Sequence, residues 1–328
     1  MGQRPSEQST GAHIRRREWL SVLWRAARTR RGTVGLALVA FVVAVAVAGP
    51  FLTRVSPTDF VVAPFSGPGP EAPLGGDALG RDVLARVLAG GWLLLLMAAA
   101  ATFFGVVVGG AAGISAAYLR GRADTLIMRS VDVLLAFPSL VFALMLVSIL
   151  GPKVWLIVLA VGLSHAPQVA RVLRASTLDI SERDFVKAVE LQGVKPRLIM
   201  AREILPNLIT PLTVETGLRL TYSIIIIAGL SFLGFGQPPP SPNWGLMINE
   251  NRIGLQLNPW AVVVPATLIA VLTVGTNTFS DAVARVALGV ERRAEGIMAL
   301  DAFALEALRS PPFPSTCPAI ARGSSSRV

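Results

Sequence analysis

Six apolar stretches, each long enough to cross a membrane, limit what this chain can fold into. A helix needs roughly 20 apolar residues to span about 30 Å of hydrocarbon. Because 53% of the 328 residues are hydrophobic and only 15% are charged, composition also places the chain among membrane proteins. We therefore predict an all-α membrane protein with six transmembrane helices. The predicted spans are Thr33–Leu52, Gly91–Leu119, Val131–Leu150, Val154–Ala170, Leu208–Leu233 and Ala261–Val283.

The placement of the basic residues sets the predicted orientation. The chain carries 30 Lys and Arg against 20 Asp and Glu, a formal net charge of +10. If both termini lie in the cytoplasm, 24 of the 30 basic residues fall in cytoplasmic segments, as the positive-inside rule requires. Membrane topology thus accounts for the net positive charge, and nucleic acid is not an expected partner. We predict a multi-pass protein of the bacterial plasma (inner) membrane, embedded in the lipid bilayer with both termini cytoplasmic.

The spans divide the chain into segments with different expected roles. Arg16-Arg17 resembles a twin-arginine export signal, but further arginines separate it from the apolar run and five more spans follow. An uncleaved first span is therefore expected. In the tail, Glu295–Arg309 is compatible with one helix, and the Pro- and Ser-rich end is expected to be disordered. The predicted segments are a basic cytoplasmic arm (1–32), the first transmembrane helix (33–53), an extracytoplasmic loop rich in Pro and Gly (54–90), a five-helix core (91–285) and a cytoplasmic tail (286–328).

The chain lacks the residues that most catalytic and metal sites need. A single cysteine, Cys317, excludes an intramolecular disulfide and a cysteine metal cluster, and the two histidines, His13 and His165, are too few and too far apart for a recognisable metal site. None of the three lysines is followed by Ser or Thr, so there is no phosphate-binding loop. We predict no catalytic residue, no metal and no cofactor. The chain is not expected to be an enzyme, and energy for transport would come from a partner or an ion gradient.

The longest charged interruption in the second half of the chain is Ser181–Pro206. Ser181 and the aspartate three residues later are spaced like a helix-capping pair, and Gly193 followed by Pro196 predicts a helix end and a new start. We expect a short amphipathic helix, a glycine turn and a second helix that stops at Leu205-Pro206, all outside the bilayer. On its own, this pattern also fits an interfacial helix without a partner. The apolar side of the first helix comprises Phe185, Val186, Ala188 and Val189.

This segment resembles the EAA loop of bacterial ABC importer permeases. Lys187-Ala188-Val189 falls on the EAA triplet, Gly193 on the family's glycine, and Leu205-Pro206-Asn207 on its terminal LPN. The resemblance implies a type I ABC importer transmembrane domain whose cytoplasmic loop docks into a groove on an ATPase subunit. Lys187 reverses the charge of the family's glutamate, which puts any ion pair made by that glutamate in doubt. The residues implied in ATPase coupling are Phe185, Lys187, Ala188, Glu190, Leu191, Gly193, Leu205 and Pro206.

Other motifs resemble the dipeptide/oligopeptide/nickel branch of these permeases. They are GGDALGRD at Gly75–Asp82, FPS at Phe137–Ser139, and LSFLGFG at Leu230–Gly236 followed by a proline run and Asn243-Trp244-Gly245. Asn277, Asp281 and Arg285 are similar to the family's closing pattern. The resemblance implies a C-type permease for peptides or nickel. The implied partners are a second homologous permease subunit, two cytoplasmic ABC ATPase subunits and an extracytoplasmic solute-binding protein.

The expected outer loops carry two structural predictions. Arg81 and Asp82 can begin an amphipathic helix on the outer membrane surface, and two readings of their motif stay open, a structural turn or a substrate contact. Trp244 and Trp260 bracket the last outer loop, where interfacial aromatic residues belong.

Within the spans, small and polar residues mark helix contacts. Gly105, Gly109 and Gly113 form a small-residue face, which predicts close packing against another helix of this chain or of a second subunit. Pro138 frees a backbone carbonyl and should kink the third span. His165 is interpreted as a packing residue whose hydrogen bonds are satisfied, with a proton relay as the alternative.

Glu215 and Arg219 lie four residues apart in the fifth span, in the favourable order for an ion pair on one helix face. Arg219 is near mid-bilayer, where ionisable residues usually face a bundle interior or a water-filled cavity. Two readings stay open: a mutually neutralised structural pair, or a pathway lining that meets peptide termini or a co-translocated charge.

Three function classes compete. The leading one is the permease subunit of an ATP-driven importer. An ion-gradient-driven secondary transporter would show internal repeats with broken helices and paired midplane charges, and no convincing repeat is present. A receptor or scaffold that binds lipid through its basic arm leaves the Ser181–Pro206 segment unexplained.

Overall fold

The structure is a computed structural model that describes residues 21–53, 55–237, 239–287 and 289. The export-signal motif at Arg16-Arg17, most of the basic arm and the tail helix predicted at Glu295–Arg309 lie outside these residues. The described residues form helices, with no β-structure among them beyond two isolated bridges. In chain order the helices are α2 (Arg30–Leu52), α3 (Val83–Ala89), α4 (Trp92–Leu119), α5 (Gly121–Leu135), α6 (Ser139–Leu150), α7 (Val154–Ser181), α8 (Asp184–Leu191), α9 (Pro196–Ile199), the π-helix η1 (Met200–Ile204), the 3-10 helix η2 (Leu205–Leu208), α10 (Ile209–Leu230), the π-helix η3 (Ser231–Phe235), α11 (Trp244–Asn251), the 3-10 helix η4 (Arg252–Gly254) and α12 (Trp260–Ala287).

Among the described residues, five helical runs are long and apolar enough to cross a membrane. They are α2, Val83–Leu119, α7, Pro196–Phe235 and α12. The pair α5 and α6 passes the same test only when taken together, and it is bent by 87°. The chain is therefore a multi-pass helical protein, whose described residues contain five candidate spans, or six if the bent pair counts as one.

The third predicted span, Val131–Leu150, is not one continuous helix. Helix α5 ends at Leu135, and α6 begins at Ser139, directly after Pro138. The prediction of a kink at Pro138 is confirmed, but the prediction of one helix across it is wrong. The physical reason is that the residue before a proline is driven out of the helical conformation, and the proline itself has no N–H for the ladder.

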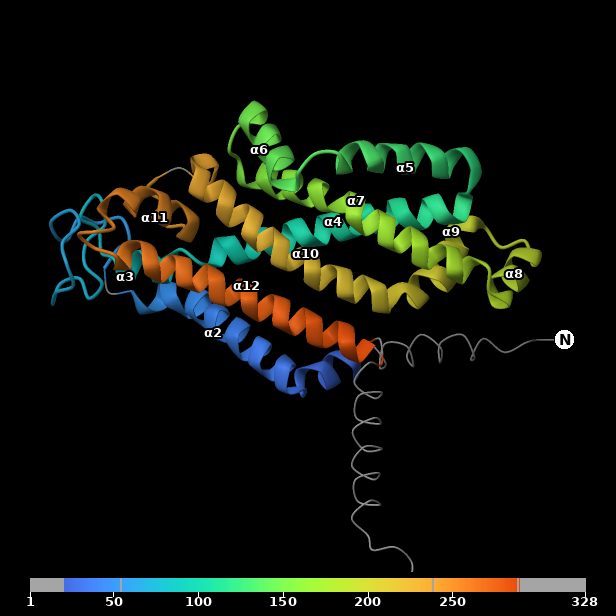
Figure 1. Ribbon diagram of the computed structural model, residues 1–328, viewed down its shortest axis with the longest axis horizontal. Coiled ribbons are helices and arrows are strands. Elements are labelled where there is room, and N and C mark those ends of the chain that lie inside the picture. The colour runs from blue at the N-terminus through green and yellow to red at the C-terminus, as the bar shows by residue number, and fades with distance from the viewer. Residues whose placement is uncertain (1–20, 54, 238, 288, 290–328) are drawn as a thin grey trace, which may run out of the picture. The chain divides into compact units, whose positions relative to one another are not determined.

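Helices α4 and α7 form the centre of the bundle (Figure 1) and meet through glycines. A Cβ atom built on Gly105, Gly109 or Gly113 would lie 2.7, 2.3 or 2.3 Å from a carbonyl oxygen of α7, and the three oxygens belong to Gly162, Ala166 and Ala170. Contacts that short exclude any side chain, so the small-residue face packs within this chain.

Two more helix pairs complete the bundle. Helices α2 and α12 lie side by side (Figure 1), and a Cβ on Gly35 would stand 2.6 Å from the backbone nitrogen of Phe279. Helix α10 packs against both α4 and α12. Its Ser223 hydroxyl hydrogen-bonds Thr102 of α4 at 3.0 Å, and both side chains are buried.

The two tryptophans of the last predicted outer loop have different environments. Trp244, at the start of α11, is 0% exposed, and its Nε1 donates a hydrogen bond of 2.8 Å to the carbonyl oxygen of Val87. It is a core residue, so its prediction as an interfacial aromatic is wrong. The partner that makes burial possible is the end of α3, 157 residues away in sequence, which no local pattern reveals. Trp260, the first residue of α12, is 45% exposed.

Candidate functional site

Helix α8 stands at one end of the bundle, opposite the end that holds α3 and α11 (Figure 1). It begins later than predicted. Helix α7 continues to Ser181, whose hydroxyl donates to the carbonyl oxygen of Leu178 at 2.9 Å. Arg183 is the N-cap residue of α8, and its side chain makes no capping bond. The predicted capping pair of Ser181 and Asp184 is therefore wrong, because the serine is used inside the preceding helix.

Only part of the predicted apolar side of α8 is buried. Val186 is fully buried, and Val189 is half-buried against an apolar cluster that includes Ile180, Ile199 and Ile204. The other two apolar residues of that side, Phe185 and Ala188, point to solvent, and so does the neighbouring Leu191, which is 90% exposed. The remaining residues of the predicted coupling set are also exposed, apart from the half-buried Pro206; they are Lys187, Glu190, Gly193 and Leu205.

The turn after α8 has the geometry that the sequence predicted. Gly193 has φ = +71°, a left-handed conformation that glycine adopts without strain. Its N–H donates to the carbonyl oxygen of Glu190 at 2.9 Å. Nothing lies within 4 Å of the place where a Cβ would stand, so only backbone conformation restricts this position. Pro196 then occupies the first turn of α9, where a missing N–H costs nothing.

The predicted stop at Leu205-Pro206 is wrong, because the chain stays helical from Pro196 to the end of α10. Pro206 sits in the first turn of the 3-10 helix η2, where its lack of an N–H is tolerated. The side-chain amide of Asn207 donates to the carbonyl oxygen of Glu203 at 2.5 Å. That bond supplies a donor to a carbonyl at the junction of the π- and 3-10 segments. The helical backbone that leads into the long span thus begins at Pro196, directly after the turn that follows α8.

A charge cluster, termed here the α8 charge cluster, consists of Arg120, Glu182 and Lys187. Glu182 accepts a hydrogen bond from Arg120 and lies 3.0 Å from the Lys187 ammonium. The two cations hold the pKa of Glu182 below its usual range. All three side chains are more than half exposed. Lys187, the residue that differs from the EAA pattern, is thus paired within its own chain.

The predicted Glu215–Arg219 pair is present in α10. Arg219 Nε lies 3.1 Å from Glu215 Oε2, and Arg219 Nη1 lies 3.3 Å from the side-chain amide of Gln168 on α7. The Tyr222 ring covers the guanidinium, with 5.3 Å between Cζ and the ring centroid. Near this pair His165 is 1% exposed, and neither ring nitrogen has a hydrogen-bond partner. Its prediction as a satisfied packing residue is therefore wrong.

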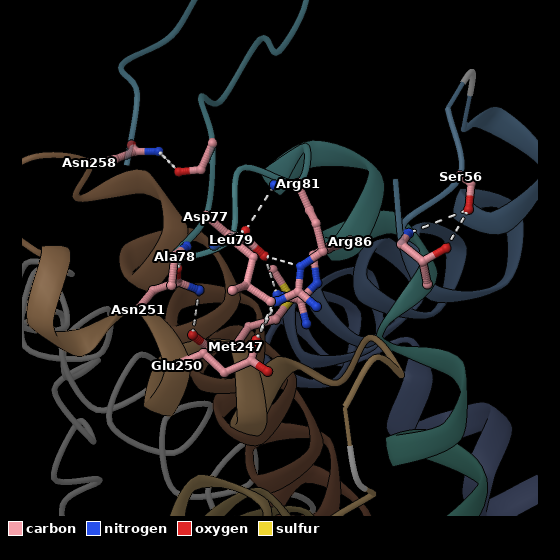
Figure 2. A network of polar contacts seen from close by, with 12 residues as sticks. Ser56, Asp77, Ala78, Leu79, Arg81, Arg86, Met247, Glu250, Asn251 and Asn258 are labelled. Atoms are coloured by element: carbon pink, nitrogen blue, oxygen red, sulfur yellow. Dashed lines mark hydrogen bonds and ion pairs between the residues drawn. The ribbon is translucent and has the colours of Figure 1, made fainter. Parts of the chain in front are cut away.

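A second charge cluster lies at the opposite end of the bundle, and Figure 2 shows it from close by. This α11 charge cluster consists of Asp77, Arg81, Arg86 and Glu250. Arg81 and Arg86 donate to Asp77 Oδ2 at 2.6 and 2.5 Å and to Glu250 Oε2 at 2.9 and 2.7 Å. The Asp77, Arg81 and Arg86 side chains are almost completely buried. The cluster ties the GGDALGRD loop and α3 to α11.

Backbone donors and charge keep Asp77 ionised in this buried position. Burial alone would raise its pKa, but the N–H groups of Arg81 and Leu79 and the charges of Arg86 and Arg81 outweigh burial. The pKa of Asp77 therefore lies below its usual value. Two asparagines extend the network: Asn251 Oδ1 accepts from the N–H of Ala78, and Asn258 donates to the carbonyl oxygen of Gly76.

Of the two readings of the GGDALGRD motif, this network supports the structural turn. The helix predicted after Arg81 exists as α3, and Asp82 caps it by accepting from the N–H of Leu84 at 3.0 Å. Its Val83 and Arg86 are fully buried, so its placement on an outer membrane surface is wrong. Arg86 of α3 can be buried because it pairs with two carboxylates outside the helix, those of Asp77 and Glu250.

Sequence reasoning missed several residues that complete these clusters. Glu182 stood inside the Ser181–Pro206 motif, and its partners Arg120 and Lys187 only become evident in three dimensions. Gln168 and Glu250 carry no local signal at all, because each contacts a residue 51 or more positions away. Among the described residues, no group of three or more His, Cys, Asp or Glu side chains is arranged to hold a metal ion.

Comparisons with known proteins place the chain among transport proteins. The family model described as "Binding-protein-dependent transport system inner membrane component" matches residues 105–287. A putative peptide transport system permease protein of Brucella suis is 35% identical over 258 residues, which cover 78% of this chain and 87% of that protein. A dipeptide transport system permease protein of Alkalihalophilus pseudofirmus is 31% identical, with 80% and 87% covered. A glutathione transport system permease protein of Escherichia coli is 34% identical, with 79% and 86% covered.

Proposed function

This chain belongs to the family of inner membrane components of binding-protein-dependent transport systems, and on that premise we propose that it is the permease subunit of an ATP-driven importer of di- and oligopeptides. The similar proteins are named for transport of peptides, dipeptides and glutathione, and glutathione is itself a short peptide. None of these three names mentions nickel, which leaves peptides as the proposed substrate. Within the described residues no phosphate-binding loop is present, so ATP hydrolysis is assigned to a partner subunit.

The proposed assembly contains this chain, a second homologous permease, two cytoplasmic ATPase subunits and an extracytoplasmic solute-binding protein. The chain would cross the membrane six times, with the bent α5–α6 pair as one crossing and both termini in the cytoplasm. The distribution of basic residues supports this orientation. It places α8 in the cytoplasm and the α11 charge cluster on the outer side. The arm 1–32, the first span 33–53, the loop 54–90, the core 91–285 and the tail 286–328 remain the proposed segments.

The observation that carries the proposal is the exposed apolar surface of α8. A helix fixed to the bundle by Val186 still presents Phe185, Ala188 and Leu191 to solvent. Exposed apolar side chains grouped on a short helix outside the membrane favour a protein partner. The helical backbone from Pro196 into α10 would transmit movement of that partner into the membrane. In the proposed cycle, ATP closes the two ATPase subunits, which pull on residues 181–206 and open the pathway outward; ADP release reverses the movement.

Substitution of Leu191 tests this proposal. We expect Leu191→Asp to leave the stability of the purified chain unchanged, because the side chain is 90% exposed. It should weaken binding of the ATPase subunits by at least about tenfold, since a charge would enter an apolar contact. The measurements are co-purification of the ATPase and ATP-dependent peptide uptake by the reconstituted complex.

Ile253→Asp is the matched control, because Ile253 is equally exposed but lies at the α11 end of the bundle. It should retain the ATPase. If Leu191→Asp also kept full ATPase binding and uptake, α8 would not be the docking helix. Peptide uptake driven by an ion gradient in the absence of any ATPase would instead support the secondary-transporter alternative.

Lys187→Asp probes the position where this chain departs from the EAA pattern. If Lys187 faces an acidic partner surface, the variant should weaken ATPase docking. Unchanged affinity would show that Lys187 serves only its own Glu182.

The pathway is proposed to pass along α10 at Glu215 and Arg219. Its support is the depth of this pair, which lies about 9–15 Å from the first residue of a helix roughly 33 Å long at 1.5 Å per residue.

A further inference from the structure

We propose that Arg219, together with Gln168 and Tyr222, forms a subsite for the carboxylate of the transported peptide. The inference rests on the peptide-import function proposed above and assigns a ligand group to one place in the pathway. It is built on three observations: the position of Arg219 on a partly exposed side of α10, its unused hydrogen-bond donor, and the low net charge of its surroundings.

The side of α10 that carries Arg219 is only partly covered by the described part of the chain. Thr216 and Tyr222 are exposed, and Arg219, whose side chain is 12% exposed, lies between them; the three follow one another at intervals of three residues along one side of the helix. Ile225 extends the same exposed side. A guanidinium near mid-bilayer is too costly to face lipid. This side of α10 therefore faces a space that admits water and polar solutes.

The Arg219 guanidinium has a hydrogen-bond donor that no described residue uses. Nε is taken by Glu215 and Nη1 lies near the amide of Gln168, but Nη2 makes no hydrogen bond to any residue that the structure describes. An arginine with one edge free can bind a carboxylate through two parallel hydrogen bonds from Nη1 and Nη2. The Tyr222 ring lies over the guanidinium, which limits the rotation of the fork.

Glu215 makes this subsite neutral before the ligand arrives. Its side chain is 9% exposed, against 12% for that of Arg219, so both charges lie in a largely buried place. Because the pair has no net charge, the arginine can remain ionised in the membrane without attracting anions strongly from bulk solution. A transported carboxylate would meet a fixed, directed donor and would leave it again easily, which conduction requires. The buried His165, whose ring nitrogens have no hydrogen-bond partner in the described part of the chain, adds polar atoms to the bundle.

The experiment compares a tripeptide with its C-terminal amide. Both are offered to the complete complex in proteoliposomes, with the same binding protein in every preparation, so that differences between variants report on the permease alone. In wild type we expect ATP-dependent uptake of the free acid to exceed that of the amide. Arg219→Gln should reduce uptake of the free acid by roughly ten- to hundredfold, the range for a hydrogen bond to a charged group, and should leave uptake of the amide nearly unchanged. Arg219→Lys, which keeps the charge but loses the fork, should fall between the two.

Two further variants separate this effect from misfolding. Glu215→Gln combined with Arg219→Gln removes both charges together and avoids an unpaired buried carboxylate, yet it should lose the same preference for the free acid. Arg174→Gln removes an arginine that pairs with Asp124 between α7 and α5; it should change uptake of both peptides equally. An unchanged ratio of acid to amide uptake in all Arg219 variants would overturn the subsite. Failure of wild type to import either peptide with ATP would overturn the proposed function itself, and the subsite with it.

Discussion

The two charge clusters at opposite ends of the bundle are built from similar parts and differ in burial. In the α11 charge cluster, Asp77 lies between two arginines and its side chain is 0% exposed. In the α8 charge cluster, Glu182 lies between Arg120 and Lys187, but its side chain is 56% exposed. A buried ion pair holds its residues in one geometry, because breaking it leaves an uncompensated buried charge. Exposed ion pairs contribute little to stability. The comparison indicates that the α11 end is held rigidly and that the α8 end is free to follow a partner.

The largest expected effect comes from the buried cluster. Asp77→Asn leaves two buried arginines with one carboxylate fewer, which should destabilise the chain by about 3–5 kcal/mol. The measurement is thermal or denaturant unfolding of the detergent-solubilised protein. Glu71→Gln is the control, because Glu71 lies in the same loop and is exposed; it should unfold like wild type. Equal stability of Asp77→Asn and wild type would remove the basis for calling this end rigid.

A smaller effect is expected at the α8 end, from the turn. Gly193→Val should cost about 1–2 kcal/mol locally, the penalty for a side chain in the left-handed conformation. Since space around the Cβ position is open, the whole cost is conformational. Insertion and global unfolding should stay normal while peptide uptake per ATP hydrolysed falls. Gly193→Asn is the matched control, because asparagine tolerates positive φ, and it should retain coupling. Normal uptake in the valine variant would count against the turn as a coupling element.

Acidification tests the α11 charge cluster when wild type and Asp77→Asn are compared, because the other carboxyl groups, including Glu182, are present in both proteins. A carboxyl group whose pKa is lowered on folding stabilises the fold above its unfolded value and loses that contribution as the pH falls through its folded pKa. For Asp77 the usual value is 3.8, so its contribution should be complete above about pH 5 and should decline below 3.8. The measurement is the free energy of unfolding of wild type and of Asp77→Asn at several pH values between 7 and 3. The difference between the two proteins at each pH gives the contribution of Asp77. A difference that is independent of pH over this whole range, including below 3.8, is the contrary result.

The smallest effect on stability is expected at Glu182. Glu182→Gln removes both ion pairs of the α8 charge cluster, but all three side chains are largely in water. The unfolding midpoint should therefore equal that of wild type at low and at high salt. A decrease comparable to that of Asp77→Asn would show that the two ends are held alike, and the comparison would be falsified.

The helices and the glycine contacts were predictable because they depend on local patterns. Apolar length identified the long spans, the spacing of Gly105, Gly109 and Gly113 predicted close packing, and Gly193 predicted a turn with positive φ. The break at Pro138 was predicted as a kink, but its size depends on how α6 packs, which the sequence does not state. The prediction that Ser181 caps α8 was wrong for a related reason. Ser181 can either end α7 or cap α8, and the local spacing does not distinguish the two.

The charged sites were less predictable because their partners are distant in sequence. Asp77 and Arg81 were noticed only as part of a motif, and Glu250, which completes their cluster, has no motif. Trp244 looked like an interfacial residue until the end of α3 was seen to accept its N–H. The Glu215–Arg219 pair was predictable, because both residues lie on one helix, whereas Gln168 was not. The exposure of Leu191 became meaningful only when Val186 was seen to hold the other side of α8.

The backbone contact between α4 and α7 has a mechanical consequence. Where carbonyl oxygens of one helix occupy the places of missing Cβ atoms on the other, no layer of side chains can yield or slide between them. We expect the pair to tilt as one unit, so that a displacement applied at one end is passed on to the other. Bending, if the transporter bends at all, is left to places with softer joints, such as the 87° elbow between α5 and α6.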